Sequence, residues 1–500
     1  MKRTLIFVDY FDNLAFDAAK RELAKGHEVF LLGCSKSIGI CKCNYGASAW
    51  ICRFCMHLTK SKFSDFKIEE NCHCQFVDDI MSLEMVTKAE KMEFSYHDVK
   101  ELKALKYKGM NIGYAAFSTF VSITRNVSPT FNTFLKYYLD DLLRSEVRLI
   151  EVELQYMESI HPDLVVFMCG RHSNQKPLYQ IADQKGINYI VTERKWTKDG
   201  EDTYDNYVNA SPHSPKAIYN KMNECWDNGG EDKRNIAESF FYNRRHGKYA
   251  GDTIYTTKQI AGQLPDGFDD SKMNISIFNS SEDEYYSLSK EFDESGVWPN
   301  QLMALKSIFE HYKDRDDIRF YLRIHPNLGK VAYKSHTELY SLHFDNVIVL
   351  PPESSVCSYT LMDHSSKVIV FNSTMGLESS YWGKPVICLN MSDYSNLNIA
   401  YQPKSEKEVF DLIDNPILPS LKSEACLIAA YYLMGGKQEK LRYYPVKRHY
   451  YHIGPLMIET YSQFKLFHSE FLLALLLKIL RIGTHFGVLG KYHHIGQRTQ

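Results

Sequence analysis

The sequence has no excess of charge of one sign, and this excludes one broad class of partner. Its 59 lysines and arginines are balanced by 61 aspartates and glutamates, which leaves a formal net charge of −2. A general nucleic-acid binder instead carries a basic patch or stripe. We therefore expect no nucleic-acid partner.

The sequence also lacks a long uninterrupted hydrophobic run. No signal peptide is visible at the start, where the short segment TLIFVDYF has no small-residue cleavage site after it. The most membrane-like stretch, residues 471–494, is interrupted by Lys478 and Arg481, so it falls short of the ~20 apolar residues that span a bilayer. We predict a cytoplasmic protein. Residues 471–494 form either a basic amphipathic helix on the inner face of the cytoplasmic membrane or a helix docked on the protein's own core.

The length and the hydrophobic pattern predict two domains. A chain of 500 residues is too long for one ordinary core. Residues 4–34 read as strand, helix and strand, which opens a parallel sheet, and a second α/β unit starts at residue 274. The fold class is therefore α/β, with two Rossmann-like doubly wound domains in tandem that face a cleft. We predict a first domain over residues 1–200 with a Cys-rich insertion at 35–75, a connecting helical and loop region at 201–270, a second domain at 271–420 and a C-terminal helical extension at 421–500.

Polar residues follow three of the strands predicted in the second half, at the point where each strand ends. In open α/β sheets, ligands bind at the carboxyl ends of the strands. A ligand site at this edge is the prediction. The residues are Ser280 and Ser281 after the first strand, Arg323, His325 and Asn327 after the second, and Asn372, Ser373, Thr374 and Gly376 after the third.

These residue types suit a nucleotide sugar. Ser373, Thr374 and the backbone N–H groups before Gly376 open a helix, and a helix N-terminus favours an anion. Arg323 is a permanent cation that can bind phosphate through two N–H groups. Glu378, one turn into the helix, can accept hydrogen bonds from both hydroxyls of a ribose.

Each residue also has an ordinary structural interpretation. A Ser or Thr before a helix is most often its N-cap, and a nearby Glu is often the capping partner. The presence of three such strand ends in one domain favours the binding site.

Residues 274–400 resemble the C-terminal half of the bacterial capsule polysaccharide biosynthesis glycosyltransferases, which are GT-B enzymes related to the Kdo transferases of capsule assembly. The motifs are FNSSEDE, RIHPN, the strand-to-helix turn STMGLE and the segment GKPVI. The resemblance implies that this half binds a CMP-, UDP- or GDP-linked sugar. It places Ser280 and Ser281 near the phosphate or sugar, Arg323, His325, Ser373 and Thr374 on phosphate, and Glu378 on the ribose.

Residues 165–194 resemble the N-terminal half of the same family, in which a Gly-Arg turn follows one strand and an acidic residue ends the next. Cys169 stands where family members more often have Asn. The resemblance implies that Gly170 permits a tight turn and that Arg171, His172 and Glu193 face the cleft.

A sugar transferase needs a general base that takes the proton of the acceptor hydroxyl. The candidates are Asp9, Asp12, His172 and Glu193, of which we favour Glu193 and Asp12, with Asp9 on the acceptor side. Asp9 or Asp12 can equally be a helix N-cap, and Glu193 an ion-pair partner of the basic residue after it. No Asp-x-Asp sequence reads as a metal-held diphosphate site, so we predict transfer without a metal or another cofactor.

Cysteines concentrate in one region of the first half, since seven of the 12 lie between residues 34 and 74. Cys52-x-x-Cys55 has the spacing of half a zinc site. Together with Cys72 and Cys74 it predicts a structural four-thiolate zinc site. An iron–sulfur cluster or buried free thiols in an acceptor loop would give the same pattern.

Taken together, the sequence predicts an inverting, metal-independent glycosyltransferase. It would move a sugar from a nucleotide-sugar donor to a glycan or lipid-linked glycan acceptor during assembly of a capsule, O-antigen or related surface polysaccharide. Three alternatives remain: a nucleotide-sugar epimerase, a CDP-alcohol-dependent polyol-phosphate transferase of teichoic-acid type, and a non-catalytic sugar-nucleotide-binding assembly protein. In the polyol-phosphate transferase, His325 and His172 would be the acid and the base.

Overall fold

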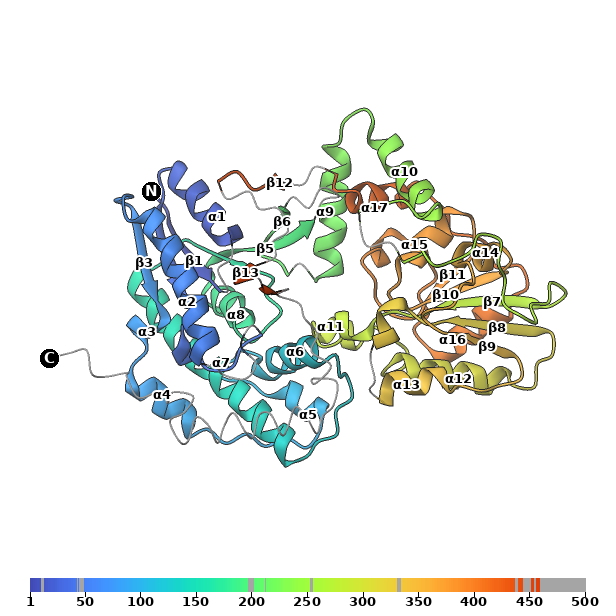
Figure 1. Ribbon diagram of the computed structural model, residues 1–500, viewed down its shortest axis with the longest axis horizontal. Helices are drawn as coiled ribbons and strands as arrows, with labels where there is room; N and C mark the ends of the chain where they lie inside the picture. The colour runs from blue at the N-terminus through green and yellow to red at the C-terminus, as the bar shows by residue number, and fades with distance from the viewer. Residues whose placement is uncertain are drawn as a thin grey trace. The chain divides into compact units, whose positions relative to one another are not determined.

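The chain forms two compact units, each built on its own sheet (Figure 1). The first unit comprises residues 1–195, 199–212 and 439–500, and the second comprises residues 196–198 and 213–438. The computed structural model describes residues 1–9, 13–42, 44, 49–196, 202–211, 213–251, 255–330, 334–436, 439–443, 451–453 and 456–458.

The first unit contains a seven-stranded sheet in the order β12-β6-β5-β4-β1-β2-β3. The five neighbouring strands from β5 to β3 are parallel, and β12 pairs antiparallel with β6. The strands are β1 (Arg3–Val8), β2 (Glu28–Gly33), β3 (Cys72–Phe76), β4 (Leu164–Met168), β5 (Asn188–Trp196), β6 (Asp202–Val208) and β12 (Glu439–Lys440).

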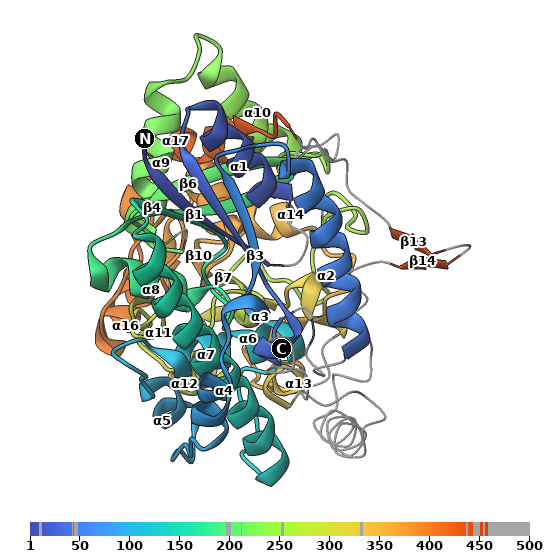
Figure 2. The same cartoon turned by 90° about the vertical axis from the view of Figure 1, so that its left-hand side faces the viewer.

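Helices cover both faces of this sheet, with α1 (Asn13–Ala24) and α2 (Ala49–Phe63) on one face and α7 (Thr133–Ile160) and α8 (Lys176–Lys185) on the other (Figure 2). On the α1 side, Phe16, Phe63 and Phe66 are buried against aliphatic side chains of β1 and β2. The removal of these apolar side chains from water is the main contribution to the stability of the fold on this face of the sheet. Between β3 and α7 the chain forms α3 (Val77–Ile80), α4 (Leu83–Glu90), α5 (Val99–Ala104) and α6 (Ile112–Thr124).

The predicted Cys-rich insertion at residues 35–75 is not confirmed. Helix α2 is instead the connection between β2 and β3, and β3 pairs in parallel with β2 from Cys72 to Phe76. The sequence CHCQF alternates apolar and polar residues as a half-buried strand does, but it was not predicted as a strand because its cysteines were interpreted as metal ligands.

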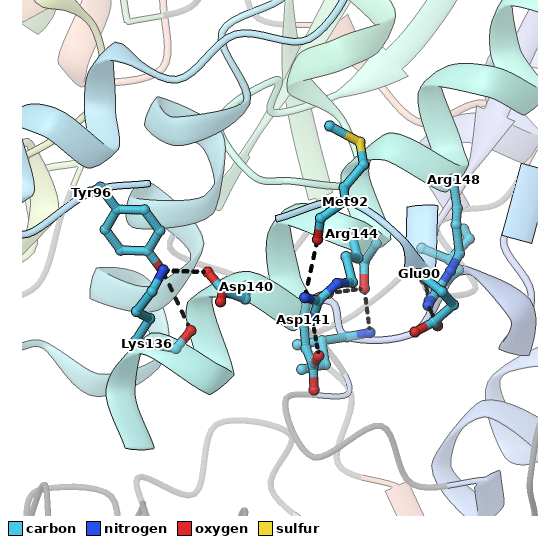
Figure 3. Close-up of polar contacts among 11 residues, drawn as sticks. Glu90, Met92, Tyr96, Lys136, Asp140, Asp141, Arg144 and Arg148 are labelled. Atoms are coloured by element: carbon cyan, nitrogen blue, oxygen red, sulfur yellow. Dashed lines mark hydrogen bonds and ion pairs between the residues drawn. The ribbon is translucent and has the colours of Figure 1, made fainter. Parts of the chain in front are cut away.

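Polar side chains of α7 hold the loops that surround it (Figure 3). The Tyr96 hydroxyl donates to Asp140 Oδ1 at 2.9 Å, and Arg148 forms an ion pair with Glu90. This long helix therefore holds the segment from Glu90 to Tyr96 against itself.

The second unit contains a five-stranded parallel sheet in the order β11-β10-β7-β8-β9. All five strands coincide with apolar runs of the sequence: NISIF, IRFYL, VIVL, VIVF and VICL. They are β7 (Met273–Phe278), β8 (Ile318–Arg323), β9 (Val347–Leu350), β10 (Lys367–Val370) and β11 (Val386–Cys388).

The helices of the second unit also form two layers. Ile308 and Phe309 of α12 share one buried cluster with Leu339 of α13 and Val409 of α16, so these helices cover the same face. Helix α15 packs against β10, β11 and α17, while α9 and α10 pack against α17. The helices are α9 (Pro215–Asp227), α10 (Lys233–Arg245), α11 (Lys290–Asp293), α12 (Gln301–Tyr312), α13 (Lys334–Tyr340), α14 (Ser358–Asp363), α15 (Thr374–Tyr381), α16 (Glu406–Asp414) and α17 (Ala425–Leu433).

Two strands near the C-terminus, β13 (Tyr451–Ile453) and β14 (Leu456–Ile458), form a small antiparallel pair. The amphipathic helix predicted at residues 471–494 lies outside the described residues. Within the described ranges, no helix combines the length and the apolar character that crossing a membrane requires.

Two carboxyl groups of α7, those of Glu146 and Glu153, are buried in the first unit. None of their four oxygens has a hydrogen-bond partner among the described residues. Burial raises the pKa of both groups well above the ordinary value, and nearby Lys176 offsets only part of this for Glu146. The folded protein therefore keeps Glu153 protonated at a pH where the unfolded chain has already lost that proton.

We expect Glu153→Gln to raise the melting temperature by an amount that grows with pH. The unfolded carboxyl ionises near 4.5 whereas the folded one ionises only at higher pH, so the free energy of unfolding falls as pH rises between these values. Glutamine does not ionise, so the free energy of unfolding of the variant does not fall with pH for this reason. Each ~1 kcal/mol recovered corresponds to roughly 2–4 °C in a unit of this size.

The measurement is a melting curve at several pH values between about 5 and about 8, where the linkage predicts a steady increase in the difference between variant and parent. Glu158→Gln is the matched control, because Glu158 lies on the same helix and its side chain is 68% exposed. A constant difference across this range for Glu153→Gln would contradict the prediction.

Candidate functional site

The strand order of the second unit brings three predicted strand ends to one place. From β7 the chain continues to β8 and β9 on one side, and it later adds β10 and β11 on the other side. The connections that follow β7 and β10 therefore diverge between neighbouring strands, and ligands bind at such points in open α/β sheets.

Side chains at the end of β7 join the three strand ends. The Asn372 N–H donates to Ser280 Oγ at 3.0 Å, and the His325 N–H donates to Asn279 Oδ1 at 2.7 Å. Gln301 fixes Ser280 in turn, because its side chain bonds both the N–H and the carbonyl of Ser280 at 3.0 and 3.1 Å. The floor of the site is therefore a rigid, hydrogen-bonded arrangement. Asn279 and Gln301 were not among the predicted residues.

Arg323, the last residue of β8, is a buried cation, and some of its N–H groups make no hydrogen bond to the described residues. It is 4% exposed, and its Nη2 donates to the Ser354 carbonyl at 2.9 Å. Its Nε and Nη1 have no hydrogen-bond partner among the described residues. Burial lowers the pKa of Arg323, and Cys357 and Glu353 partly offset this effect. A buried charge with unsatisfied N–H groups is costly, so a phosphate that accepts two hydrogen bonds would stabilise it.

Two further predicted ligands of the site support a neighbouring loop. The Ser281 hydroxyl donates to Asp283 Oδ1 at 2.9 Å, and Asn327 Nδ2 donates to Glu284 Oε1 at 3.2 Å. These side chains hold residues 281–284 in place.

The start of α15 confirms the ordinary interpretation of Ser373 as an N-cap, since its Oγ accepts from the Met375 N–H at 3.3 Å. Gly376 has a packing reason as well. A Cβ at this position would lie 2.1 Å from the Tyr394 hydroxyl oxygen, which donates to the Ser373 carbonyl at 2.7 Å. The first turn of α15 is therefore held from the side by Tyr394.

Glu378 is fully buried and its carboxylate is bonded within the second unit. Arg244 Nε donates to Glu378 Oε1 at 2.9 Å, and the Tyr359 hydroxyl donates to Oε2. Arg244 Nη2 also reaches Thr374 Oγ1 at 3.2 Å. A ribose could bond this carboxylate only if one of these partners moved away, so the ribose contact of Glu378 stays a prediction. The sequence did not point to Arg244, which precedes Glu378 by 134 residues. Its only signal was the basic run that includes the last turn of α10.

The corresponding edge of the first unit lies where β1 and β4 end side by side. Asp9 follows β1 and is buried, and its Oδ2 accepts from Asn174 Nδ2 at 2.6 Å and from Gln175 Nε2 at 2.5 Å. Asp9 is therefore not a helix N-cap but a positioning residue for the turn before α8. Asp12 lies outside the described residues.

Hydroxyl groups of α6 hold the two basic residues of this turn. Arg171 Nε donates to Ser118 Oγ at 2.8 Å. His172 is buried, with Nε2 3.1 Å from Ser122 Oγ and Nδ1 3.3 Å from Gln175 Oε1. The sequence signal that was missed is the set of hydroxyl residues within the otherwise apolar helix α6.

Cys169 and Glu193 complete the described part of this edge. Cys169 has a φ of 63°, the left-handed conformation that Asn adopts more readily than other residues, which fits the family preference for Asn at this position. Burial raises the pKa of the Cys169 thiol to about 12, with Glu193 as the next cause. Glu193 is half-buried and lies within β5 rather than at its end.

The predicted zinc ligands are not brought together. Cys72 and Cys74 are free cysteines on the same face of β3, because residues two apart on a strand point to the same face, and they pack against the aromatic cluster of the first unit. Cys52 and Cys55 lie on α2. No three of these four sulfur atoms lie within 4.8 Å of one another.

One family comparison matches part of the chain. Residues 297–411 match the family model described as capsule polysaccharide biosynthesis protein. This segment contains Arg323, His325, Ser373, Thr374 and Glu378, and the match confirms the resemblance that the motifs indicated there. No curated protein matches the chain.

Solved structures give distant likenesses. The β-Kdo 2,4 transferase of Thermosulfurimonas dismutans KpsC is 16% identical, with 53% of this chain and 78% of that chain covered and a TM-score of 0.36. The β-Kdo 2,7 transferase of the same KpsC is 14% identical, with 63% and 88% covered and a TM-score of 0.32. The UDP-GlcNAc 2-epimerase from Neisseria meningitidis is 14% identical, with 87% and 100% covered and a TM-score of 0.27. At these TM-scores the likenesses carry no weight for function.

We expect Gly376→Ala to destabilise the second unit. The added methyl group would lie 2.1 Å from the Tyr394 hydroxyl oxygen and 2.9 Å from Val370 Cγ2. Overpacking of this kind costs about 1–3 kcal/mol, measured as a lower free energy of unfolding in denaturant. In a Tyr394→Phe background the same change should cost less, because the nearest atom is gone. An unchanged stability of Gly376→Ala would contradict the contact.

We expect Arg244→Gln to be strongly destabilising, because it leaves the buried Glu378 carboxylate without its cation. Breaking a buried pair on one side costs about 3–5 kcal/mol. The double variant Arg244→Gln/Glu378→Gln should cost less than the sum of the two single variants.

The matched control is Arg234→Gln, which breaks an ion pair with Glu424 whose side chains are 58% and 63% exposed. Exposed pairs contribute at most about 1 kcal/mol. Equal effects of the two arginine variants on unfolding in urea would contradict the buried pair.

Proposed function

We propose that this chain is a glycosyltransferase of surface-polysaccharide assembly and that its second unit binds the nucleotide-sugar donor. The observation that carries the proposal is Arg323, a buried guanidinium at the carboxyl end of β8 whose Nε and Nη1 have no hydrogen-bond partner among the residues that the structure describes. The family match over residues 297–411 supports it, because that segment contains Arg323 and the turn that begins α15.

In this proposal Arg323 binds a phosphate of a CMP-, UDP- or GDP-linked sugar through two N–H groups. The N-terminus of α15, capped by Ser373, adds partial positive charge for the same phosphate, with Thr374 and His325 beside it. Glu378 takes the ribose once Arg244 or Tyr359 has moved away from its carboxylate.

The reaction is a single displacement at the anomeric carbon. The acceptor oxygen forms a bond to that carbon while the bond from the carbon to the donor phosphate oxygen breaks, and the nucleotide leaves with the electron pair. A general base takes the acceptor proton, and the configuration inverts. Arg323 stabilises the charge that develops on the leaving phosphate.

Residues of the first unit supply the acceptor side and the base in this proposal. Both ring nitrogens of His172 already face side chains of the protein, and the ring is buried. Asp9 is bonded to two amides. In this proposal the half-buried Glu193 is the general base, with Asp12 as its predicted companion.

We propose that the transfer needs no divalent metal. The sequence Asp314-x-Asp316 precedes β8 and so lies at the opposite end of that strand from Arg323. Arg323 and the α15 N-terminus would neutralise the phosphate charge instead. The acceptor is a glycan or a lipid-linked glycan at the inner face of the cytoplasmic membrane.

The test is nucleotide-sugar binding by the parent and by Arg323→Gln. We expect one nucleotide class of a CMP-, UDP- and GDP-sugar panel to raise the melting temperature of the parent. Loss of charged hydrogen bonds of about 1.5–3 kcal/mol should weaken binding by roughly 10- to 100-fold in the variant. Arg319→Gln is the control, because Arg319 lies on the same strand and donates to the Asp345 carbonyl away from the site.

The products separate the alternatives. Release of the free sugar or its transfer to a glycan acceptor, with inversion, supports the proposal. Release of glycerol phosphate or ribitol phosphate from a CDP-alcohol, or conversion of the donor to its epimer, would overturn it. Unchanged binding by Arg323→Gln would remove the assignment of the phosphate site.

A further inference from the structure

Helix α2 carries a second apolar stripe besides the side that packs on the first sheet. Phe63 belongs to the buried cluster on the sheet, and Thr59, four residues earlier, is also buried. Ile51 and Phe54 point elsewhere and are 43% and 44% exposed, and the half-buried Leu58 continues their line. Residues at this spacing share one helix face. Single exposed apolar side chains are common, but neighbours on one face mark an interaction surface. We name Ile51, Phe54 and Leu58 the apolar stripe.

A basic stripe runs along α2 beside the apolar stripe. It consists of Arg53, His57 and Lys60, which follow one another at helical spacing and are all exposed. The helix also contains Lys62, and its sequence AWICRFCMHLTKSKF has no aspartate or glutamate. Apolar and basic residues side by side on one helix are typical of helices that lie on the surface of an anionic membrane.

Hydrogen bonds hold the start of α2 at the carboxyl edge of the first sheet. Asn44 Nδ2, in the loop after β2, donates to Cys52 Sγ at 2.9 Å. Helix α7 anchors the same loop, because the Ile40 N–H donates to Ser145 Oγ at 3.0 Å. Strand β2 ends beside β1, at the edge where we place the acceptor. Ile51 directly precedes Cys52, so the apolar stripe begins at this edge and its backbone is fixed there.

We propose that α2 docks the first unit on an anionic lipid bilayer. Ile51 and Phe54 enter the boundary between the headgroups and the acyl chains, and Arg53 and Lys60 lie among the lipid phosphates. Charge complementarity selects this occupant, because the helix offers only basic groups and the inner leaflet of a cell membrane is negative. This inference deepens the proposed function and rests on it for the acceptor: a lipid-linked glycan in the same bilayer would reach the edge at which α2 begins. The surface is distinct from residues 471–494.

The experiment is sedimentation of the full chain with vesicles of equimolar phosphatidylethanolamine and phosphatidylglycerol, without nucleotide. We expect the parent to bind these vesicles, to bind pure phosphatidylcholine vesicles much more weakly, and to dissociate as salt is added. Ile51→Ser/Phe54→Ser removes most of the apolar area that enters the bilayer and should weaken binding by roughly 10- to 100-fold. Arg53→Ser/Lys60→Ser should weaken binding by roughly tenfold or more at low salt.

Two controls separate this surface from general effects. Ile417→Ser is the matched apolar control, because Ile417 lies in the second unit and is 84% exposed. It should bind vesicles as the parent does. Arg323→Gln, the variant that tests the donor site, should also bind vesicles normally. Failure of the donor site and failure of the membrane surface are therefore separate results.

Hydrogen exchange measured by mass spectrometry locates the contact even if a variant fails to fold. In the parent, peptides from residues 49–60 should exchange more slowly when the anionic vesicles are present. The proposal would be overturned by a parent that does not bind these vesicles, by a double variant Ile51→Ser/Phe54→Ser that binds as well as the parent, or by protection confined to residues 471–494.

Two further results would assign the apolar stripe to another occupant and so overturn the proposal. A parent dimer that Ile51→Ser/Phe54→Ser dissociates, seen by light scattering without vesicles, would mean that a second copy of the chain covers the stripe. A clear drop in the melting temperature of this variant without vesicles would mean that the chain itself covers it. We expect a monomer–dimer state and a melting temperature equal to those of the parent, because both side chains are already exposed.

Discussion

Parallel strands all end at the same edge of a sheet, and in each unit the first strand has later strands on both of its sides. This order leaves a gap between diverging connections at the ends of β1 and β4 and at the ends of β7 and β10. In both units a residue just after the first strand forms hydrogen bonds to the connection on the other side of this point. Asp9 bonds the turn that follows β4, and Ser280 bonds the turn that follows β10. The polar residues at both edges are thus fixed by neighbouring strands before any ligand binds.

Two arginines of the second unit, the buried Arg323 and the half-buried Arg244, have opposite electrostatic situations. Arg244 lies against Glu378, and the pair offsets part of the several kcal/mol that removing each ion from water costs. In the described part of the chain no carboxylate bonds Arg323, whose Nη2 donates to the Ser354 carbonyl. The charge of Arg244 is therefore compensated by a bonded carboxylate, whereas the charge of Arg323 is not compensated by any carboxylate bonded to it among the described residues. This difference is the physical reason for placing the donor phosphate on Arg323.

The sequence predicted the features of the fold that depend on the local pattern of residues. Apolar runs bounded by turns located all five strands of the second sheet, and the Ser373 cap followed from residue type alone. It did not predict β3, an edge strand with alternating polar residues, or the pairing of Arg244 with Glu378 across 134 residues. Spacing identified Cys52 and Cys55 as a pair, but the fold places them on α2 and Cys72 and Cys74 on β3, so the four sulfur atoms do not come together. Local rules fix the elements, whereas long-range partners depend on the topology.

The burial of Glu378 changes what a ribose contact would require. The first turn of α15 is held by Tyr394 against Gly376 and the Ser373 carbonyl, so the backbone around Glu378 has little freedom to move. Of the two partners of the carboxylate, Tyr359 is buried whereas Arg244 is half-buried. Arg244 is therefore the partner with room to leave. In the proposed donor complex, Arg244 leaves the Glu378 carboxylate as the ribose binds. The carboxylate then accepts hydrogen bonds from two ribose hydroxyl groups in place of its ion pair with Arg244. The guanidinium set free lies next to Thr374 at the start of α15, where the donor phosphate is proposed to bind.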